Sequence, residues 1–146
     1  MIESRAEVVI ERPPEAVFDF LADSRNEERW LPGAERVELL DPEPIGLGTR
    51  FRGRYARTGE VALELVEFER PSRVTFRARS RIVDFDDAVV LTPKDGGTLL
   101  RATMRAQPKG MMRFVAPLMG RTMSRQFQSN WTCLKRALEA APAASS

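Results

Sequence analysis

Apolar and polar residues alternate at the start of the chain. Between residues 3 and 11 the polar face is interrupted only by Val9, and the other face carries Ala6, Val8 and Ile10. A period of two residues is typical of a β-strand that buries one side. Pro13 and Pro14 end this pattern, and proline is favoured in the first turn of a helix. We therefore predict an opening strand and then a short helix with the apolar stripe Val17, Phe18 and Leu21.

A second short helix is predicted directly after the first. Ser24 precedes Glu27 by three residues, which is the spacing of a capping box at a helix N-terminus. This helix is expected to run to about Arg29. Trp30 and the turn formed by residues 31–33 end it.

The middle of the chain repeats a pattern of short alternating stretches separated by turn residues. Such short connections can join only antiparallel neighbours, because a parallel pair requires a long crossover. We predict a meander of six strands, at residues 37–39, 49–57, 60–70, 74–78, 82–92 and 98–107.

The pattern changes to a helical period near the C-terminus. Apolar residues recur every three or four positions at Val115, Met119, Met123, Phe127, Trp131, Leu134 and Leu138. Because Pro117 falls inside this stripe, we expect either a kink there or a separate short segment at residues 111–116. The element order predicts an α+β domain over residues 1–141, with residues 142–146 as a flexible tail.

Composition narrows the class of protein. The 146 residues are enough for one domain, and no apolar run approaches the roughly 20 residues of a membrane span. The N-terminal stretch alternates and does not resemble a secretory signal. Cys133 is the only cysteine, so no disulfide forms within the chain. These features predict a cytoplasmic protein.

Charge and histidine content exclude several functions. The formal net charge is only +2, and Arg50, Arg52 and Arg54 alternate with less polar residues, which is typical of a solvated outer sheet face. We therefore predict no nucleic-acid partner. The chain has no histidine, which excludes histidine-based catalytic triads, histidine metal sites and histidine-ligated haem. No cofactor and no metal are expected.

Several short motifs, taken in order, resemble one family. They are PPEAVFDFLAD from Pro13, followed by Trp30 and Pro32, then GLGTRF from Gly46, VEFERPSRV from Val66, GGT from Gly96 and LKRALE near the end. Together they resemble the polyketide cyclase/dehydrase branch of the START-like, helix-grip superfamily (SRPBCC). The resemblance implies a Bet v 1-like fold, in which a curved antiparallel sheet of about seven strands holds two short helices and one long C-terminal helix. It also implies a hydrophobic cavity between sheet and long helix.

The apolar face of the pattern supplies the residues expected around such a cavity. Five methionines lie in or near the last strand and the long helix, and flexible thioethers suit varied apolar ligands. The expected lining residues are Phe51, Tyr55, Val74, Phe76, Val89, Leu91, Leu100, Met104, Met119, Met123, Phe127 and Trp131.

Acid–base chemistry has few candidates. The strand predicted at residues 82–92 carries Asp84, Asp86 and Asp87, and alternation places Asp87 on the face opposite Asp86. An aspartate in an apolar pocket would have a raised pKa and could act as a general base, although a solvated strand end explains all three more simply. Tyr55 is the only tyrosine, and it could orient a ligand carbonyl together with Thr49 or Asn130.

The segment at residues 109–121 joins apolar residues, glycines and three cations just before the long helix. It is interpreted as a buried connection, with a pocket lid or a transient membrane-touching edge as the alternatives.

The leading hypothesis is a protein that binds or carries a small hydrophobic molecule, such as a lipid, a polyketide or an aromatic compound. A polyketide cyclase or dehydratase is the second hypothesis, and it requires polar groups such as Asp87 and Tyr55 to meet inside the cavity. The third is an interaction module with a closed cavity. Neither the ligand nor the oligomeric state follows from the sequence.

Overall fold

The computed structural model describes residues 2–140, and within them all strands form one antiparallel sheet in the order β1-β7-β6-β5-β4-β3-β2. The predicted meander is confirmed, and the opening strand β1 closes onto the last strand, β7. The predicted tail at residues 142–146 lies outside the described residues. The strands are β1 (Ile2–Ile10), β2 (Ala34–Leu39), β3 (Arg50–Tyr55), β4 (Gly59–Glu69), β5 (Arg73–Arg79), β6 (Val83–Lys94) and β7 (Gly97–Pro108).

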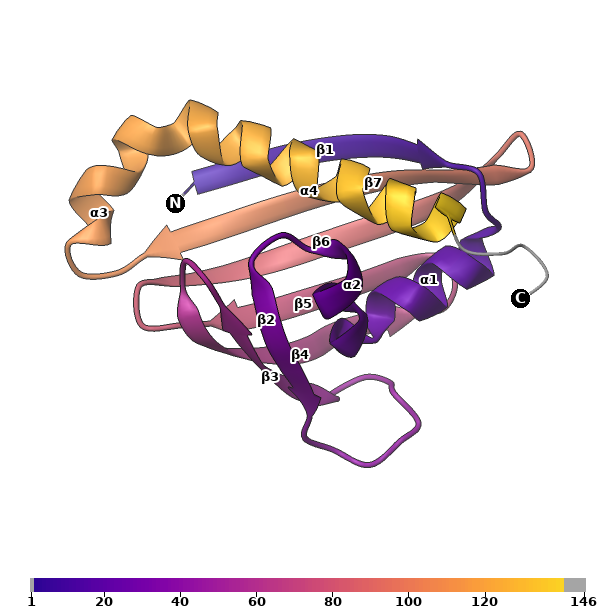
Figure 1. Cartoon of the computed structure of the whole chain (residues 1–146), viewed down its shortest axis with the longest axis horizontal. Coiled ribbons are helices and arrows are strands. Elements are labelled where there is room, and N and C mark those ends of the chain that lie inside the picture. The colour runs from indigo at the N-terminus through magenta and orange to yellow at the C-terminus, as the bar shows by residue number, and fades with distance from the viewer. Residues whose placement is uncertain (1, 141–146) are drawn as a thin grey trace.

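The helices lie on one side of the curved sheet (Figure 1). The long helix α4 crosses the sheet along β1, while α1 and α2 lie beside it and α2 packs against α4. This is the predicted α+β helix-grip arrangement. The helical elements are α1 (Pro14–Ala22), η1 (Ser24–Asn26), α2 (Glu27–Trp30), α3 (Met112–Val115), η2 (Ala116–Met119) and α4 (Gly120–Ala140).

The predicted capping box at Ser24 is wrong. The helical segment begins one residue earlier than expected, because the side chain of Asp23 accepts a hydrogen bond from the backbone N–H of Arg25. Ser24 is fully buried, and Glu27 opens α2 instead of closing a cap. The Glu27 side chain is thereby free for another contact.

The C-terminal stripe is buried only in its second half. Phe127, Trp131, Leu134 and Leu138 of α4 belong to the core. Pro117 lies in η2, so the separate short segment predicted before the long helix is present. The first residues of the stripe do not face the sheet, because the chain turns away from the sheet between α3 and α4.

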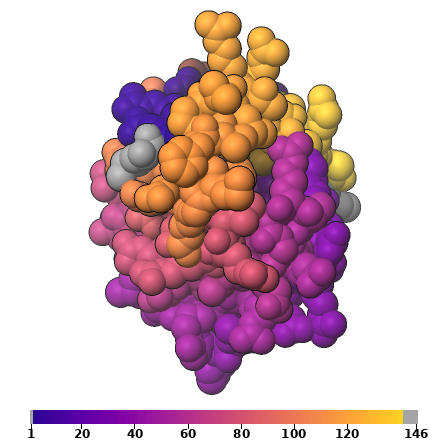
Figure 2. Space-filling model, turned by 90° about the vertical axis from the view of Figure 1, so that its left-hand side faces the viewer, coloured from indigo at the N-terminus to yellow at the C-terminus, as the bar shows by residue number. Residues whose placement is uncertain are grey.

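This turning segment is exposed, and the predicted buried connection is wrong. The exposed fractions are 83% for Met111, 74% for Phe114 and 87% for Leu118. Val115 and Met119 are also exposed, and Ala116 is the buried residue of α3 and η2. Figure 2 shows the segment, in orange, protruding from one end of the molecule.

The outer face of the sheet is solvated as predicted. Arg50, Arg52 and Arg54 are exposed on β3, whereas Phe51 and Gly53 between them are buried. Ion pairs such as Arg77–Asp86 and Arg101–Glu7 link neighbouring strands on this outer face. Exposed pairs of this kind contribute little to stability, so the fold depends on the apolar inner face.

Candidate functional site

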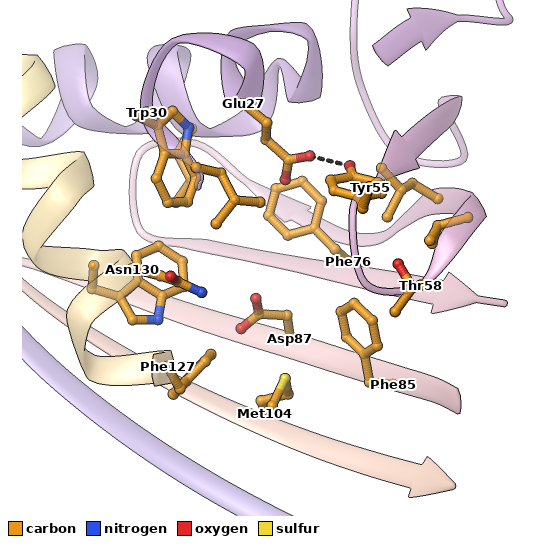
Figure 3. Close-up of a pocket in the computed structure, with 15 residues that line it drawn as sticks. Glu27, Trp30, Tyr55, Thr58, Phe76, Phe85, Asp87, Met104, Phe127 and Asn130 are labelled. Carbon is orange, nitrogen blue, oxygen red and sulfur yellow. Dashed lines mark hydrogen bonds between the residues drawn. The ribbon is translucent and has the colours of Figure 1, made fainter. Parts of the chain in front are cut away.

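A cavity of about 170 Å³ lies between the sheet and the helices α2 and α4 (Figure 3). Its wall combines apolar side chains, aromatic rings and a few polar groups. The lining residues are Leu21, Glu27, Trp30, Leu31, Tyr55, Thr58, Val61, Leu63, Phe76, Phe85, Asp87, Met104, Phe127, Asn130 and Trp131.

Aromatic rings form the helical side of the cavity. Trp30 ends α2 and meets Trp131 of α4, with ring centroids 5.7 Å apart. Phe127, one turn earlier on α4, contacts Trp131 edge to face at 5.8 Å. These are favourable geometries for ring pairs. They fix α2 against α4 and hold the helical wall in place.

Glu27 is a buried acid at the start of α2. Burial raises the pKa of its carboxyl to about 7, and a hydrogen bond from the Tyr55 hydroxyl partly offsets that rise. Burial also raises the pKa of Tyr55 above its ordinary value, with the charge of Glu27 adding to the effect. The tyrosine therefore stays a hydrogen-bond donor at neutral pH.

Gly53 leaves the space that the side chain of Tyr55 occupies. The two residues lie on the same face of β3, and the tyrosine ring folds back over the glycine. A Cβ atom at Gly53 would lie 2.5 Å from the ring carbon Cε2 of Tyr55 and 2.7 Å from its hydroxyl oxygen. Glycine at this position therefore lets the ring reach Glu27.

Asp87 is the second acid of the cavity. Burial, together with the nearby charge of Glu27, raises the pKa of its carboxyl to about 8. The Oδ1 atom of Asp87 is buried and has no hydrogen-bond partner among residues 2–140. Such an unsatisfied polar atom is costly unless a ligand or water supplies a partner.

The neighbouring aspartates behave differently. Asp86 points outward and pairs with Arg77 at 3.1 Å, and Asp84 pairs with Lys109 at 3.0 Å. The predicted alternation is thus confirmed, and the interpretation as a solvated strand end is correct for Asp84 and Asp86. For Asp87 that simpler interpretation is wrong, because β6 turns this side chain under the helices.

Few other polar groups reach the cavity. Asn130 lies on its wall, where its side-chain oxygen accepts a hydrogen bond from Gln126 at 2.8 Å. The indole N–H groups of Trp30 and Trp131 are buried and find no partner within the described chain. No group of three or more acids or cysteines that could hold a metal ion occurs in residues 2–140. The polar part of the cavity wall is therefore small.

The structure separates the residues expected around the cavity into two groups. Those on its wall are Tyr55, Phe76, Met104, Phe127 and Trp131. Those that instead pack within the continuous core, together with Phe18 of α1, are Phe51, Val74, Val89, Leu91 and Leu100. For the residues of β6 and β7 the reason is the second helix layer, because α1 packs against these two strands and covers part of their inner face.

Three further expectations are not met. Met119 is exposed at the end of η2, Met123 is half-buried in the first turn of α4, and neither lines the cavity. Thr49 is buried in a turn, where its hydroxyl accepts a hydrogen bond from the N–H of Gly46 at 2.9 Å. Asn130, not Thr49, shares the cavity with Tyr55.

Two important residues were missed by the sequence analysis. Glu27 was assigned to a cap, and Trp30 was treated as the end of a helix. An acid and a tryptophan three residues apart lie on one face of a helical turn, and this signal could have drawn attention to both.

The comparisons with known proteins agree with this geometry. Residues 1–139 match the family described as polyketide cyclase / dehydrase and lipid transport. The chain belongs to this family. A search of curated proteins found no match. The family and the helix-grip fold make this a ligand-binding architecture.

Solved structures share the fold across almost the whole chain. The protein TTHA0849 from Thermus thermophilus is 24% identical, with 99% of each chain covered and a TM-score of 0.75. Ara h 8.0201 is 14% identical, with 95% of this chain and 98% of that chain covered and a TM-score of 0.69. Aha1 from Colwellia psychrerythraea is 16% identical, with 96% of this chain and 98% of that chain covered and a TM-score of 0.67. At these identities the similarity shows the fold alone.

Proposed function

We propose that this protein binds a small, largely apolar molecule in the cavity between the sheet and α4. The observation that carries the proposal is the aromatic-lined cavity of about 170 Å³ in a family described by cyclisation, dehydration and lipid transport. An apolar cavity of roughly 150 Å³ in another protein accommodates benzene. The size therefore favours a ligand of one or two rings over a long acyl chain.

Native mass spectrometry of protein purified gently from its own host tests this proposal. We expect a stoichiometric small-molecule adduct that organic extraction releases and identifies. The variant Phe76→Arg places a charged side chain in the cavity and should lose the adduct, provided that circular dichroism shows a folded protein. An adduct retained by the folded variant would contradict the assignment of the cavity.

Acid–base catalysis is a second candidate, favoured by one specific observation. Glu27, Tyr55 and Asp87 line the same small cavity, and the pKa values of the two acids, about 7 and about 8, are near neutral. A carboxylate with such a pKa is suited to general-base chemistry. This is the convergence of polar groups that a cyclase or dehydratase requires.

Proton abstraction from 5-nitrobenzisoxazole provides a probe of this second candidate. The reaction needs only a base in an apolar site, so the natural substrate does not have to be known. We expect a rate that rises with pH through about 8, levels off above about pH 9, and falls at least about tenfold in Asp87→Asn. A rate equal to that of free acetate would exclude a catalytic base in the cavity.

The exposed segment supports a further part of the proposal. We define the tip patch as Met111, Phe114, Val115, Leu118 and Met119. The cations Arg113 and Arg121 accompany it, whereas Lys109 at its edge pairs with Asp84; no Asp or Glu occurs between Gly96 and Leu138. Apolar side chains among cations suit the surface of an anionic membrane.

We therefore propose that the tip patch touches anionic lipid surfaces transiently while the cavity collects or releases its ligand. No helix among residues 2–140 is both long and apolar enough to span a membrane. The cavity argues against an interaction module whose interior is closed, and a protein partner at the patch is the alternative outcome of vesicle binding. A cytoplasmic location stays a prediction.

A further inference from the structure

The wall of the cavity has an unusual chemical composition. It combines two carboxyl groups with six aromatic rings, and it contains no lysine or arginine. We propose that the ligand of this cavity is a lipophilic organic cation, whose ammonium group lies between Glu27 and Asp87 against the aromatic rings. This inference rests on the proposed binding function and names the chemical class of the ligand.

The two acids face the same space from opposite sides. Figure 3 shows Glu27 descending from α2 and Asp87 rising from β6, with the ring of Phe76 beside both. The effect of Glu27 on the pKa of Asp87 also requires that the carboxyl groups be near each other. A ligand that enters the cavity therefore meets both acids.

The aromatic rings favour a cation in that space. The face of an aromatic ring carries partial negative charge and attracts an ammonium group within about 6 Å. Trp30 and Trp131 have the strongest ring faces of the natural side chains, and Phe76, Phe85 and Phe127 add to them. Rings around a quaternary ammonium group replace its water without requiring hydrogen bonds.

The protein groups of the cavity leave its two acids without a compensating positive charge. Its acids are driven toward the neutral form because burial and their mutual repulsion disfavour negative charge, and Asp87 Oδ1 has no partner among the described residues. A cation between them would remove both penalties. An anionic ligand would add a third negative group and is disfavoured.

The pH response of binding can be assigned to these two acids. The titratable groups on the wall are Glu27 from α2, Tyr55 from β3 and Asp87 from β6. The tyrosine has a pKa above its ordinary value and does not ionise near neutral pH. The lining residues from α1, β4, β5, β7 and α4 carry no ionisable side chain, namely Leu21, Val61, Leu63, Phe76, Met104, Phe127, Asn130 and Trp131.

Two probes of equal shape isolate the charge. Benzyltrimethylammonium and neopentylbenzene differ only by nitrogen for carbon, so packing and size are matched. Both tryptophans of the chain line the cavity, so intrinsic fluorescence reports binding of either probe. We expect the cation to bind at least about tenfold more tightly than the hydrocarbon at pH 8.5.

The pH dependence of the cation provides the second expected result. At a pH below the pKa of a cavity acid, that acid is neutral and must release its proton when the cation binds. Its affinity should therefore rise about tenfold per pH unit between pH 5 and 7 and level off above about pH 8. The affinity of neopentylbenzene should change less than about twofold over the same range.

Asp87→Asn removes one negative charge without changing the shape of the side chain. We expect this variant to bind the cation about tenfold less tightly and the hydrocarbon about as well as before. Asp86→Asn is the matched control, because Asp86 points outward and pairs with Arg77. The control should bind both probes like the unchanged protein.

The results that overturn the inference are separable from failure of the proposed function. Equal, pH-independent affinities for the two probes would reject a cation site while leaving an apolar binding cavity. Tighter binding of the neutral ketone isobutyrophenone at pH 5 than at pH 8.5 would also reject it, because the acids would then act as neutral donors. If no probe binds, the proposed binding function itself fails.

Discussion

The cavity and the tip patch are both apolar and rich in aromatic or methionine side chains, but their charges are opposite. Glu27 and Asp87 are the charged residues of the cavity wall, while Lys109, Arg113 and Arg121 flank the patch. One region is enclosed by two helices and the sheet, whereas the other projects into solvent. The polar groups that surround an apolar surface, and not the apolar surface itself, therefore indicate what it binds.

This difference is hidden in the total charge. The formal net charge of +2 describes a nearly balanced chain. The fold gathers two acids inside, and it places the flanking cations at one exposed end. A surface that attracts anionic headgroups can thus stand beside an interior that attracts cations.

The largest difference in stability is expected when a phenylalanine is replaced by alanine in each of the two regions. Phe76→Ala removes a ring that is 7% exposed, while Phe114→Ala removes one that is 74% exposed. The first should lower the free energy of unfolding by about 3 kcal/mol or more, and the second by less than about 0.5 kcal/mol. Urea denaturation measures both, and equal losses would contradict the distinction between the regions.

The buried acids should make stability depend on pH. In the folded protein the pKa values of Glu27 and Asp87 are raised to about 7 and about 8 from ordinary values of 4.5 and 3.8. Between these limits the folded chain holds protons that the unfolded chain has released. Stability is therefore highest below about pH 4 to 5 with respect to these groups, and it is lost as pH rises toward 8.

Asp87→Asn should flatten this dependence. At pH 9 we expect the variant to have a free energy of unfolding on the order of 2 kcal/mol above that of the unchanged protein, with a smaller difference at pH 5. Thermal or urea denaturation across pH tests it. A variant that is less stable than the parent at pH 9 would show that Asp87 is ionised and satisfied in the fold.

The tip patch should respond to loss of one apolar side chain. Leu118→Ser should weaken binding to vesicles that contain anionic lipid by about tenfold, since burial of a leucine contributes roughly 1.5 kcal/mol or more. Leu47 is 72% exposed elsewhere on the surface, so Leu47→Ser is the matched control. Vesicle sedimentation measures both, and equal losses would exclude the patch as the contact surface.

The smallest effect on stability is expected from removing the hydrogen bond between Tyr55 and Glu27 inside the cavity. Tyr55→Phe removes the donor that partly offsets the raised pKa of Glu27, so this pKa should rise above about 7. The loss of stability should be about 1 kcal/mol. Carboxyl carbon NMR titration follows the pKa directly. An unchanged or lower Glu27 pKa in a folded variant would show that the tyrosine does not stabilise the carboxylate.

The fold could be predicted because each local pattern agreed with the global arrangement. The turn at Asp95 and Gly96 joins two long alternating strands, and the stripe at Phe127, Trp131 and Leu134 requires a large apolar surface. Period and turn chemistry depend on neighbouring residues, so a sequence displays them directly.

The site was only half predictable, because its wall depends on which helix covers which strand. Alternation placed Asp87 on the face opposite Asp86, but it did not show which of the two points inward, and it could not distinguish Phe76 on the cavity wall from Val89 in the core. Glu27 followed a local capping pattern that the neighbouring Asp23 replaced. The exposure of Phe114 and Leu118 was not predicted, because an apolar stripe along a helix normally faces a core.

The central claim, that the apolar ligand site lies inside the cavity, is tested most directly by isotope-filtered NOE measurements with neopentylbenzene. We expect contacts from the probe to the rings of Trp131 and Phe76, which line the cavity. Contacts confined to Phe114 and Leu118, which are exposed at the tip patch, would contradict it.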